Sequence, residues 1–268
     1  NVRDAACYLC WSWCRSCPNM NRPIVTKLSC ALLSLSIFDR EIFCRRAASA
    51  AFQELAGRTG LVPHGIEILL KINYFSISSL QSCFSELFDF ASRFTEYRAY
   101  LIGYLMDVTS QCFDKNVRIL AASALASQRL DRSIVDKLIK NVHGGELVLI
   151  HFGLLTISKL TNLTNEDMEY MAEKLNEELI QFSSWPNSRK LGYELLAESW
   201  LQYVRSMAIS NVPYDLSIVL EVFKTALRSR SPVIHQNFAF PALQAISQRS
   251  QPSDPLLTSF YVLLYSSI

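Results

Sequence analysis

A short sequence motif recurs along this chain at an interval that few folds can explain. A basic residue followed by small apolar residues occurs at Arg3-Asp4-Ala5-Ala6, at Arg45-Arg46-Ala47-Ala48 and at Arg118-Ile119-Leu120-Ala121-Ala122. Arg3 and Arg46 are 43 residues apart, and Arg46 and Arg118 are 72 apart, or two units of 36. A period of roughly 40 residues is typical of repeats that are each a pair of antiparallel helices. The chain is therefore expected to be a stack of such pairs.

The spacing of apolar residues predicts helices on both sides of each motif. Apolar residues recur at intervals of three and four, as at Leu101, Leu105 and Val108, which places them on one helical face. No sustained alternation of apolar and polar residues predicts a strand. The expected pairs are roughly 22–38 with 40–56, 66–73 with 77–93, 96–111 with 115–130, 132–142 with 146–161, 166–182 with 188–209, and 214–229 with 232–248.

The composition agrees with long helices joined by short turns. The chain has 8 Gly and 9 Pro among 268 residues, and it is 50% hydrophobic and 19% charged. Thr164, with Asp167 at capping-box distance, and Asp215 have the features of helix starts. The expected fold class is an all-α solenoid of the HEAT/armadillo type, a curved superhelix of about seven helix pairs that forms one domain over residues 1–268. Because the first residues, Asn-Val-Arg-Asp, read as helix interior, we expect a fragment of a larger chain.

Charge, hydropathy and motifs exclude several function classes. The 26 Lys+Arg against 24 Asp+Glu give a net charge of +2, so no global field attracts nucleic acid. No stretch approaches the roughly 18 uninterrupted apolar residues of a spanning helix, so no membrane partner is expected. The sequence has no glycine-rich phosphate-binding motif, and its four histidines lie in separate repeats. We therefore expect no cofactor and no catalytic residues.

Four cysteines near the start of the chain superficially resemble a metal-ligand set. Cys7, Cys10, Cys14 and Cys17 share one face of a helix. That face is about 15 Å long at 1.5 Å per residue, whereas the sulfur ligands of one zinc ion lie roughly 2.3 Å from it. We therefore expect no metal, and small buried thiols instead. The 8 cysteines, in a chain too large to need disulfides, fit a reduced cytoplasmic protein.

Charged residues at the helix turns are expected to form a structural ladder. Asp39 lies six residues before Arg45, and Asp114 lies four before Arg118. These spacings allow a carboxylate in one turn to meet a guanidinium at the next helix start, and such pairs commonly fix the register of packed elements. The ladder residues are Arg3, Asp39, Arg45, Arg46, Asp114 and Arg118, with Arg45 or Arg46 as the partner of Asp39.

One part of the sequence resembles a known family. The runs from Asn1 to Trp11 and from Phe38 to Glu54, followed by Gly57-Arg58 and Pro63-His64-Gly65-Ile66, are similar to the central part of the tubulin-folding cofactor D family. The likeness covers about the first 130 residues, and beyond Arg132 only the helical period continues.

The resemblance implies a cytoplasmic, microtubule-associated HEAT scaffold that is not itself an enzyme and that captures β-tubulin. It implies as further partners cofactors E and C and an ADP-ribosylation-factor-like small GTPase, with which the family assembles or dissociates αβ-tubulin dimers. It also implies stimulation of GTP hydrolysis by a partner. An alternative is another HEAT-repeat adaptor, in nuclear transport, phosphatase scaffolding or nucleic-acid binding, and the near-neutral charge argues against the last.

Polar residues around the expected turns at 40–65 are the candidate partner-binding residues. They lie in the stretch that most resembles the family, and exposed turns of a rigid scaffold often carry function. Gly57 to Gly65 is expected to be such a turn, with Arg58 at its tip. The candidates are Arg40, Glu41, Arg58 and His64.

Overall fold

The computed structural model describes residues 2–17, 19–160, 164–183, 192–210, 216–227, 231–249, 258–259 and 262. The regular structure in these ranges is helical and includes no strand, which confirms the expected all-α class. None of the helices found there is long and apolar enough to cross a membrane. The chain divides into two compact units, Asn1–Leu125 and Ala126–Ile268, each described by itself. A single domain over 1–268 stays a prediction.

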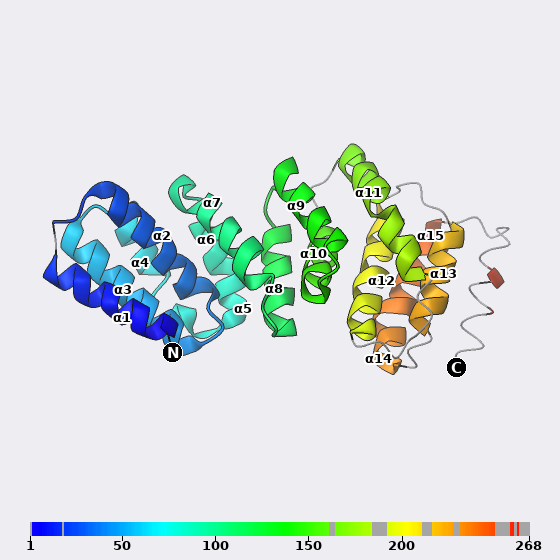
Figure 1. The fold of residues 1–268 in the computed structure, drawn as a ribbon, viewed down its shortest axis with the longest axis horizontal. Coiled ribbons are helices and arrows are strands. Elements are labelled where there is room, and N and C mark those ends of the chain that lie inside the picture. Colours follow the sequence, from blue (N-terminus) through cyan, green and yellow to red (C-terminus); the bar gives the residue numbers. More distant parts are fainter. Residues whose placement is uncertain are drawn as a thin grey trace. The chain divides into compact units, whose positions relative to one another are not determined.

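Unit 1 consists of helices that pack in two layers. Helix α3 lies against both α1 and α2, and α2 also lies against α7 (Figure 1). Ala48 and Ala51 of α3 are fully buried, and such small side chains let neighbouring helices approach closely. The elements are α1 (Val2–Ser16), α2 (Arg22–Phe38), α3 (Ile42–Thr59), α4 (Gly65–Lys71), η1 (Ser76–Ser78), α5 (Leu80–Ser82), η2 (Cys83–Leu87), α6 (Phe88–Ala91), α7 (Thr95–Tyr104), η3 (Leu105–Thr109) and α8 (Lys115–Ala126).

Local sequence sets the bounds of α2 and α3. The Asn21 side chain accepts a hydrogen bond from the main-chain N–H of Ile24, and Pro23 lies in the first turn, where its missing N–H costs nothing. Helix α3 ends at Gly60, whose φ of 61° is the left-handed conformation that glycine adopts most easily. The expected helix 40–56 therefore continues to Thr59, so Gly57 and Arg58 belong to its last turn and not to an exposed loop.

Two expected helices of unit 1 are less regular than their sequence pattern. The segment expected as one helix over 77–93 is a 3₁₀ turn at 76–78 followed by helix over 80–91 with a π-helical turn at 83–87. The segment expected over 96–111 ends in a second π-helical turn at 105–109. Apolar packing accompanies these turns, because the Phe38 ring lies 5.1 Å from Phe84, 5.6 Å from Phe88 and 5.8 Å from Tyr104 between centroids.

Unit 2 repeats the paired arrangement. Helix α10 packs against α9 and α12, and α13 packs against α11 and α12. The expected capping box is present, because the Thr164 hydroxyl and the Asp167 carboxylate each accept a hydrogen bond from the other residue's main-chain N–H. The expected helix start at Asp215 and the expected helical residues 188–191 and 228–229 lie outside the described residues. The elements are α9 (Arg132–His143), α10 (Leu147–Lys159), α11 (Asn165–Ser183), α12 (Tyr193–Ile209), α13 (Leu216–Leu227), α14 (Pro232–Ile234), η4 (His235–Ala239) and α15 (Phe240–Arg249).

Candidate functional site

The Asp39 carboxylate joins two successive helix pairs. It accepts hydrogen bonds from Nε of Arg3 at 2.5 Å and from a terminal nitrogen of Arg3 at 3.3 Å, across 36 residues of sequence. It also accepts a hydrogen bond from the main-chain N–H of Glu41 at 2.9 Å. The Asp39 side chain is 2% exposed, and its hydrogen bond raises the pKa of the Arg3 guanidinium above its ordinary value. The carboxylate therefore holds the first helix of the chain to the turn of the next pair.

Arg45 is placed differently from the expected Asp39–Arg45 carboxylate pair. Its guanidinium, 2% exposed, donates to four main-chain carbonyls: those of Asp39 at 2.8 Å, Arg40 at 3.1 Å, Ile77 at 2.8 Å and Ser78 at 3.1 Å. Asp39 and Arg40 directly follow α2, and Ile77 and Ser78 are the last two residues of η1, so all four oxygens lie at helix ends, where carbonyls are left unpaired and carry partial negative charge. The interaction with Asp39 thus goes through its main-chain oxygen, because the carboxylate already binds Arg3.

Arg118 repeats the geometry of Arg45. Its guanidinium donates to the main-chain carbonyls of Cys112 and Phe113, six and five residues earlier. Each arginine is the fourth residue of its helix, so Arg118 corresponds in structure to Arg45, 73 residues before it, and not to Arg46. The Asp114 carboxylate accepts a hydrogen bond from the main-chain N–H of Asn116 at 2.8 Å.

Arg46 faces a different neighbour. Its guanidinium carbon lies 4.1 Å from the centroid of the Tyr74 ring, and a terminal nitrogen donates to the Ser78 hydroxyl at 3.4 Å. This stacking leaves Arg46 outside the ladder of Arg3, Asp39 and Arg45. It contributes a cation–π contact between α3 and the segment after α4.

The four candidate partner-binding residues lie at opposite ends of α3. Arg40 and Glu41 precede its first residue and pair with each other at 3.2 Å. Arg58 lies in its last turn, and His64 directly precedes α4. Helix α3 has 18 residues, and a rise of 1.5 Å per residue separates its two ends by about 27 Å. The structure therefore brings Arg58 and His64 to one site and places Arg40 and Glu41 at another.

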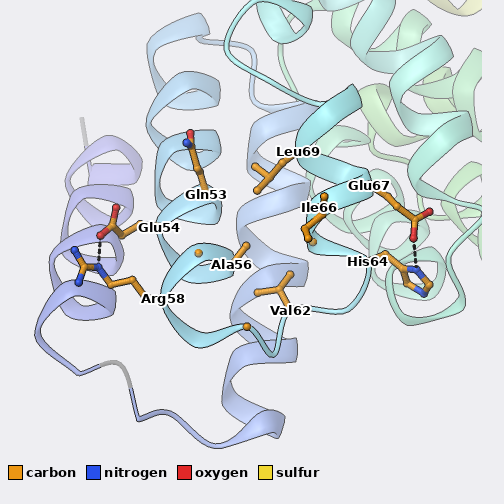
Figure 2. Close-up of a pocket in the computed structure, with 12 residues that line it drawn as sticks. Gln53, Glu54, Ala56, Arg58, Val62, His64, Ile66, Glu67 and Leu69 are labelled. Carbon is orange, nitrogen blue, oxygen red and sulfur yellow. Dashed lines mark hydrogen bonds and ion pairs between the residues drawn. The ribbon is translucent and has the colours of Figure 1, made fainter.

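Arg58 and His64 line an open groove of ≈ 1080 Å³ between α3 and α4. Figure 2 shows Ala56, Val62, Ile66 and Leu69 in its middle. Gly57 and Gly60 also line it, and a Cβ atom added to either would meet no atom within 4 Å. The middle of the groove is therefore apolar, with small residues of α3 on one side and aliphatic residues of α4 on the other.

The rims of the groove each carry a polar pair of side chains (Figure 2). On the α3 side Nε of Arg58 donates to the Glu54 carboxylate, which also lies 3.9 Å from Nε of Arg15. On the α4 side Nδ1 of His64 lies 3.3 Å from the Glu67 carboxylate. The charged rims and the apolar floor together match the usual anatomy of a protein-binding surface.

His64 has an unusual main-chain conformation, with φ 51°. Its ring stacks on Phe94 with centroids 4.4 Å apart, and its Nε2 lies 3.8 Å from the Glu96 carboxylate. Hydrogen bonding from its own main-chain N–H at the start of α7 holds the pKa of Glu96 below its ordinary value. These contacts from α7 hold the imidazole at the edge of the groove.

Exposed apolar residues continue from the groove along α4, and the sequence interpretation missed them. Ile66 is 78% exposed and Leu70 is 77% exposed, one turn apart on the face opposite the buried Ile68. Phe75 beyond the helix is 81% exposed. The available signal was an apolar residue at every position from Ile68 to Leu70, more than one helical face can bury.

Arg40 borders a smaller pocket of ≈ 290 Å³ at the other end of α3. Arg3, Phe38 and Tyr104 also line it, together with Phe113, whose side chain is 90% exposed. Burial raises the pKa of the Tyr104 phenol to about 12, so this group remains a neutral hydrogen-bond donor at neutral pH. The pocket is a second apolar surface beside a cation.

The cysteines of α1 differ in burial. Cys7 and Cys14 are buried, Cys10 is partly buried, and Cys17 is exposed after the helix ends. Burial raises the pKa of the Cys7 thiol to about 12 and that of Cys14 to about 11. Metal binding requires thiolates, and no group of three potential ligands gathers in the part of the chain that the structure describes.

Paired helices that bury a shared core and stack on their neighbours define the class of HEAT and armadillo helical-repeat proteins. Residues 1–66 match the family described as "Tubulin-specific chaperone D-like, ARM repeats", which confirms the resemblance read from the sequence for that part of the chain.

Two curated relatives are similar to this chain, each over fewer than half of its residues. The chain is 38% identical over 128 residues to "Tubulin-specific chaperone D" of Dictyostelium discoideum, covering 47% of this chain and 9% of that protein. It is 34% identical over 127 residues to "Tubulin-folding cofactor D" of Schizosaccharomyces pombe, covering 47% of this chain and 11% of that protein. The matched part thus spans about a tenth of each relative. No solved structure matches the chain.

Proposed function

We propose that this chain is part of a tubulin-folding cofactor, a non-catalytic scaffold in the cytoplasm and on microtubules. It captures β-tubulin and acts with cofactors E and C and an ADP-ribosylation-factor-like small GTPase to assemble or dissociate αβ-tubulin dimers. GTP hydrolysis takes place in a partner, and the scaffold stimulates it. The similarity to proteins named tubulin-specific chaperone D and tubulin-folding cofactor D supports this proposal.

The observation that carries the proposal is the position of the groove. Its lining runs from Gln53 to Leu69, so most of it lies within the residues 1–66 that match the chaperone D family. An apolar floor with charged rims is suited to a protein surface and offers no arrangement of groups for covalent chemistry. Arg58 and His64 are the proposed contact residues on its rims, and Arg40 and Glu41 are proposed to form a second contact beside the smaller pocket.

The test is capture of purified tubulin and of the purified small GTPase by the complete protein carrying Arg58→Glu or His64→Asn. Asparagine is preferred to alanine at position 64 because it tolerates positive φ. The exposed Glu54–Arg58 pair contributes less than about 1 kcal/mol to stability, whereas a central interface residue contributes about 2 kcal/mol or more to binding. We expect nearly parental melting temperatures with tubulin affinity lowered about 30-fold.

Lys27→Glu is the matched control, because Lys27 is an exposed lysine of α2 that does not line the groove. It makes the same charge change as Arg58→Glu and should leave capture unchanged. If Arg58→Glu and His64→Asn both capture tubulin and the GTPase with parental affinity, the groove is not the binding site.

A further inference from the structure

We infer that the groove between α3 and α4 binds an amphipathic α-helix of a partner protein. The helix presents an aliphatic stripe to the groove, with acidic residues flanking the stripe on the α3 side and basic residues on the α4 side. This inference rests on the proposed function only in that the groove binds a protein. It adds the secondary structure and the chemistry of the segment that is bound.

The lining favours a helix over an extended segment. The walls are the last turns of α3 and the first turns of α4, so the groove offers no sheet edge to which an extended segment could pair. An extended segment would need a separate partner for each main-chain polar group that it buries, whereas a helix pairs its own.

Gly57 indicates close approach of the bound segment. Glycine within a helix is destabilising relative to alanine, yet no atom of the described structure lies within 4 Å of the position that a Cβ would occupy there. The fold of this chain therefore gives no steric reason for the missing side chain. A helix lying in the groove would contact the α3 backbone directly at this position, as small residues allow at helix crossings.

The exposed charges on the two rims are complementary to such a helix. Arg58, 42% exposed, lies on the α3 rim, and Glu67, 64% exposed, lies on the α4 rim (Figure 2). A helix with its apolar stripe in the groove sets one flank over each rim. Acidic residues over Arg58 and basic residues over Glu67 give attraction on both sides, and the opposite arrangement gives repulsion on both.

The apolar part of the interface extends beyond the groove. Ile66 lines the groove, and Leu70 follows it one turn later along α4, both more than three-quarters exposed. Anchors spaced four residues apart match the i, i+4 spacing of aliphatic side chains on a partner helix. The bound stripe therefore runs along α4 past the end of the groove.

The experiment uses two synthetic helical peptides of about 18 residues, long enough to be stable helices in an alanine-rich background. Both carry the same leucine and alanine stripe. In one peptide the flanking acidic and basic residues match the rims, and in the other both flanks carry glutamine. Binding of each fluorescent peptide to the 268-residue chain is measured by anisotropy. We expect the matched peptide to bind at least ten times more tightly.

Two variants test the geometry. In the Arg58→Glu chain, in which both rims are acidic, we expect the preference for the matched peptide to be lost. Gly57→Leu should abolish binding of both by filling the groove, whereas Gly57→Ala should melt no lower than the parent and keep most of the binding. Lys27→Glu should change neither affinity.

The inference is overturned if neither peptide binds, if the peptide with glutamine flanks binds equally well, or if a proline-containing extended version of the matched peptide binds as tightly. Its failure is distinct from failure of the proposed function. If Arg58→Glu loses tubulin capture and neither peptide binds the parental chain, the proposed function stands and a bound helix is excluded. If the matched peptide binds but the complete protein captures no tubulin, the bound helix stands and the proposed function is excluded.

Discussion

Arg3 and Arg45 lie in the first turns of α1 and α3, and their guanidinium groups bind different partners. Arg3, half-exposed, binds a buried carboxylate from the next helix pair. Arg45, fully buried, binds four main-chain carbonyl oxygens at the ends of α2 and η1. A buried charge needs such compensation because the loss of water is otherwise costly. The Arg45 environment supplies it from main-chain dipoles without a carboxylate.

The thiols of unit 1 should make stability depend on alkaline pH. Burial raises the pKa of Cys7 to about 12 and those of Cys14 and Cys83 to about 11, from their ordinary value of 9.0. Above pH 9 the unfolded chain releases these protons and the folded chain keeps them. Their contribution is therefore complete below about pH 9 and is lost as pH rises toward 11 to 12. We expect a loss of about 1 kcal/mol per thiol by pH 10, measured from urea midpoints at pH 8 and pH 10.

Other groups also titrate in this range, so the comparison between variants is decisive. Cys7→Ala should reduce the difference in unfolding free energy between the two pH values, and Ser16→Ala, which removes an exposed hydroxyl and no thiol, should leave it unchanged. An unaltered pH dependence in Cys7→Ala would show that this thiol is not protected by the fold. Elemental analysis of the same preparations should find no stoichiometric zinc or iron.

At the scale of the helix, two glycines should respond oppositely to the same substitution. A Cβ at Gly57 of α3 meets no atom within 4 Å, whereas a Cβ at Gly153 of α10 would lie 2.9 Å from the Leu138 carbonyl oxygen and 3.0 Å from a Val142 methyl. Gly57→Ala should raise the free energy of unfolding by about 0.5–1 kcal/mol through helix propensity. Gly153→Ala should lower it by about 1–3 kcal/mol, because α9 and α10 must separate. Urea denaturation of both variants measures this, and destabilisation by Gly57→Ala would contradict the open groove.

The sequence predicted the regular helices well and the irregular turns not at all. The expected 22–38 is the observed α2, because a cap and a proline mark its start. The π-helical turns at 83–87 and 105–109 keep apolar residues at spacings that a regular helix also allows, so periodicity cannot distinguish them. The sequence pattern predicts a loop at Gly57, because two glycines close together normally end a helix. In the structure α3 continues past Gly57 and ends at Gly60.

At the scale of the molecule, Arg45 should stabilise the joint between helix pairs, which is the contact of the α2–α3 turn with residues 77 and 78. Arg45→Met keeps the side-chain bulk and removes the donors from four main-chain carbonyls in two buried and two part-buried hydrogen bonds, which should cost about 3 kcal/mol. Hydrogen exchange should show the largest loss of protection at the end of α2, the start of α3 and residues 76–91. Arg40→Met, at a half-exposed side chain, should stay within about 0.5 kcal/mol of the parent. Loss of protection spread evenly over all described elements would contradict this joint.

The candidate site could be predicted in part. The sequence indicated Arg58 and His64, and the structure places both on one groove. It could not indicate that Arg40 and Glu41 lie at the other end of α3, because residues that are close in the sequence are separated here by the length of that helix. The contact of Arg45 with residues 77 and 78 could not be predicted from the sequence either. Every residue type has a main-chain carbonyl, so the sequence does not show which one accepts the hydrogen bond.

Every amino acid supplies a carbonyl oxygen, and this makes the Arg45 joint tolerant of mutation. Replacing Ile77 or Ser78 changes a side chain and leaves the acceptor of the arginine in place. A neighbouring repeat can thus lose the basic motif through substitutions and still accept the same hydrogen bonds from Arg45. The pair expected over 66–93 lacks the basic motif and nevertheless occupies its position in the stack. The side chains of a repeat can therefore change while its packing stays the same, because Arg45 binds main-chain oxygens that every residue type supplies.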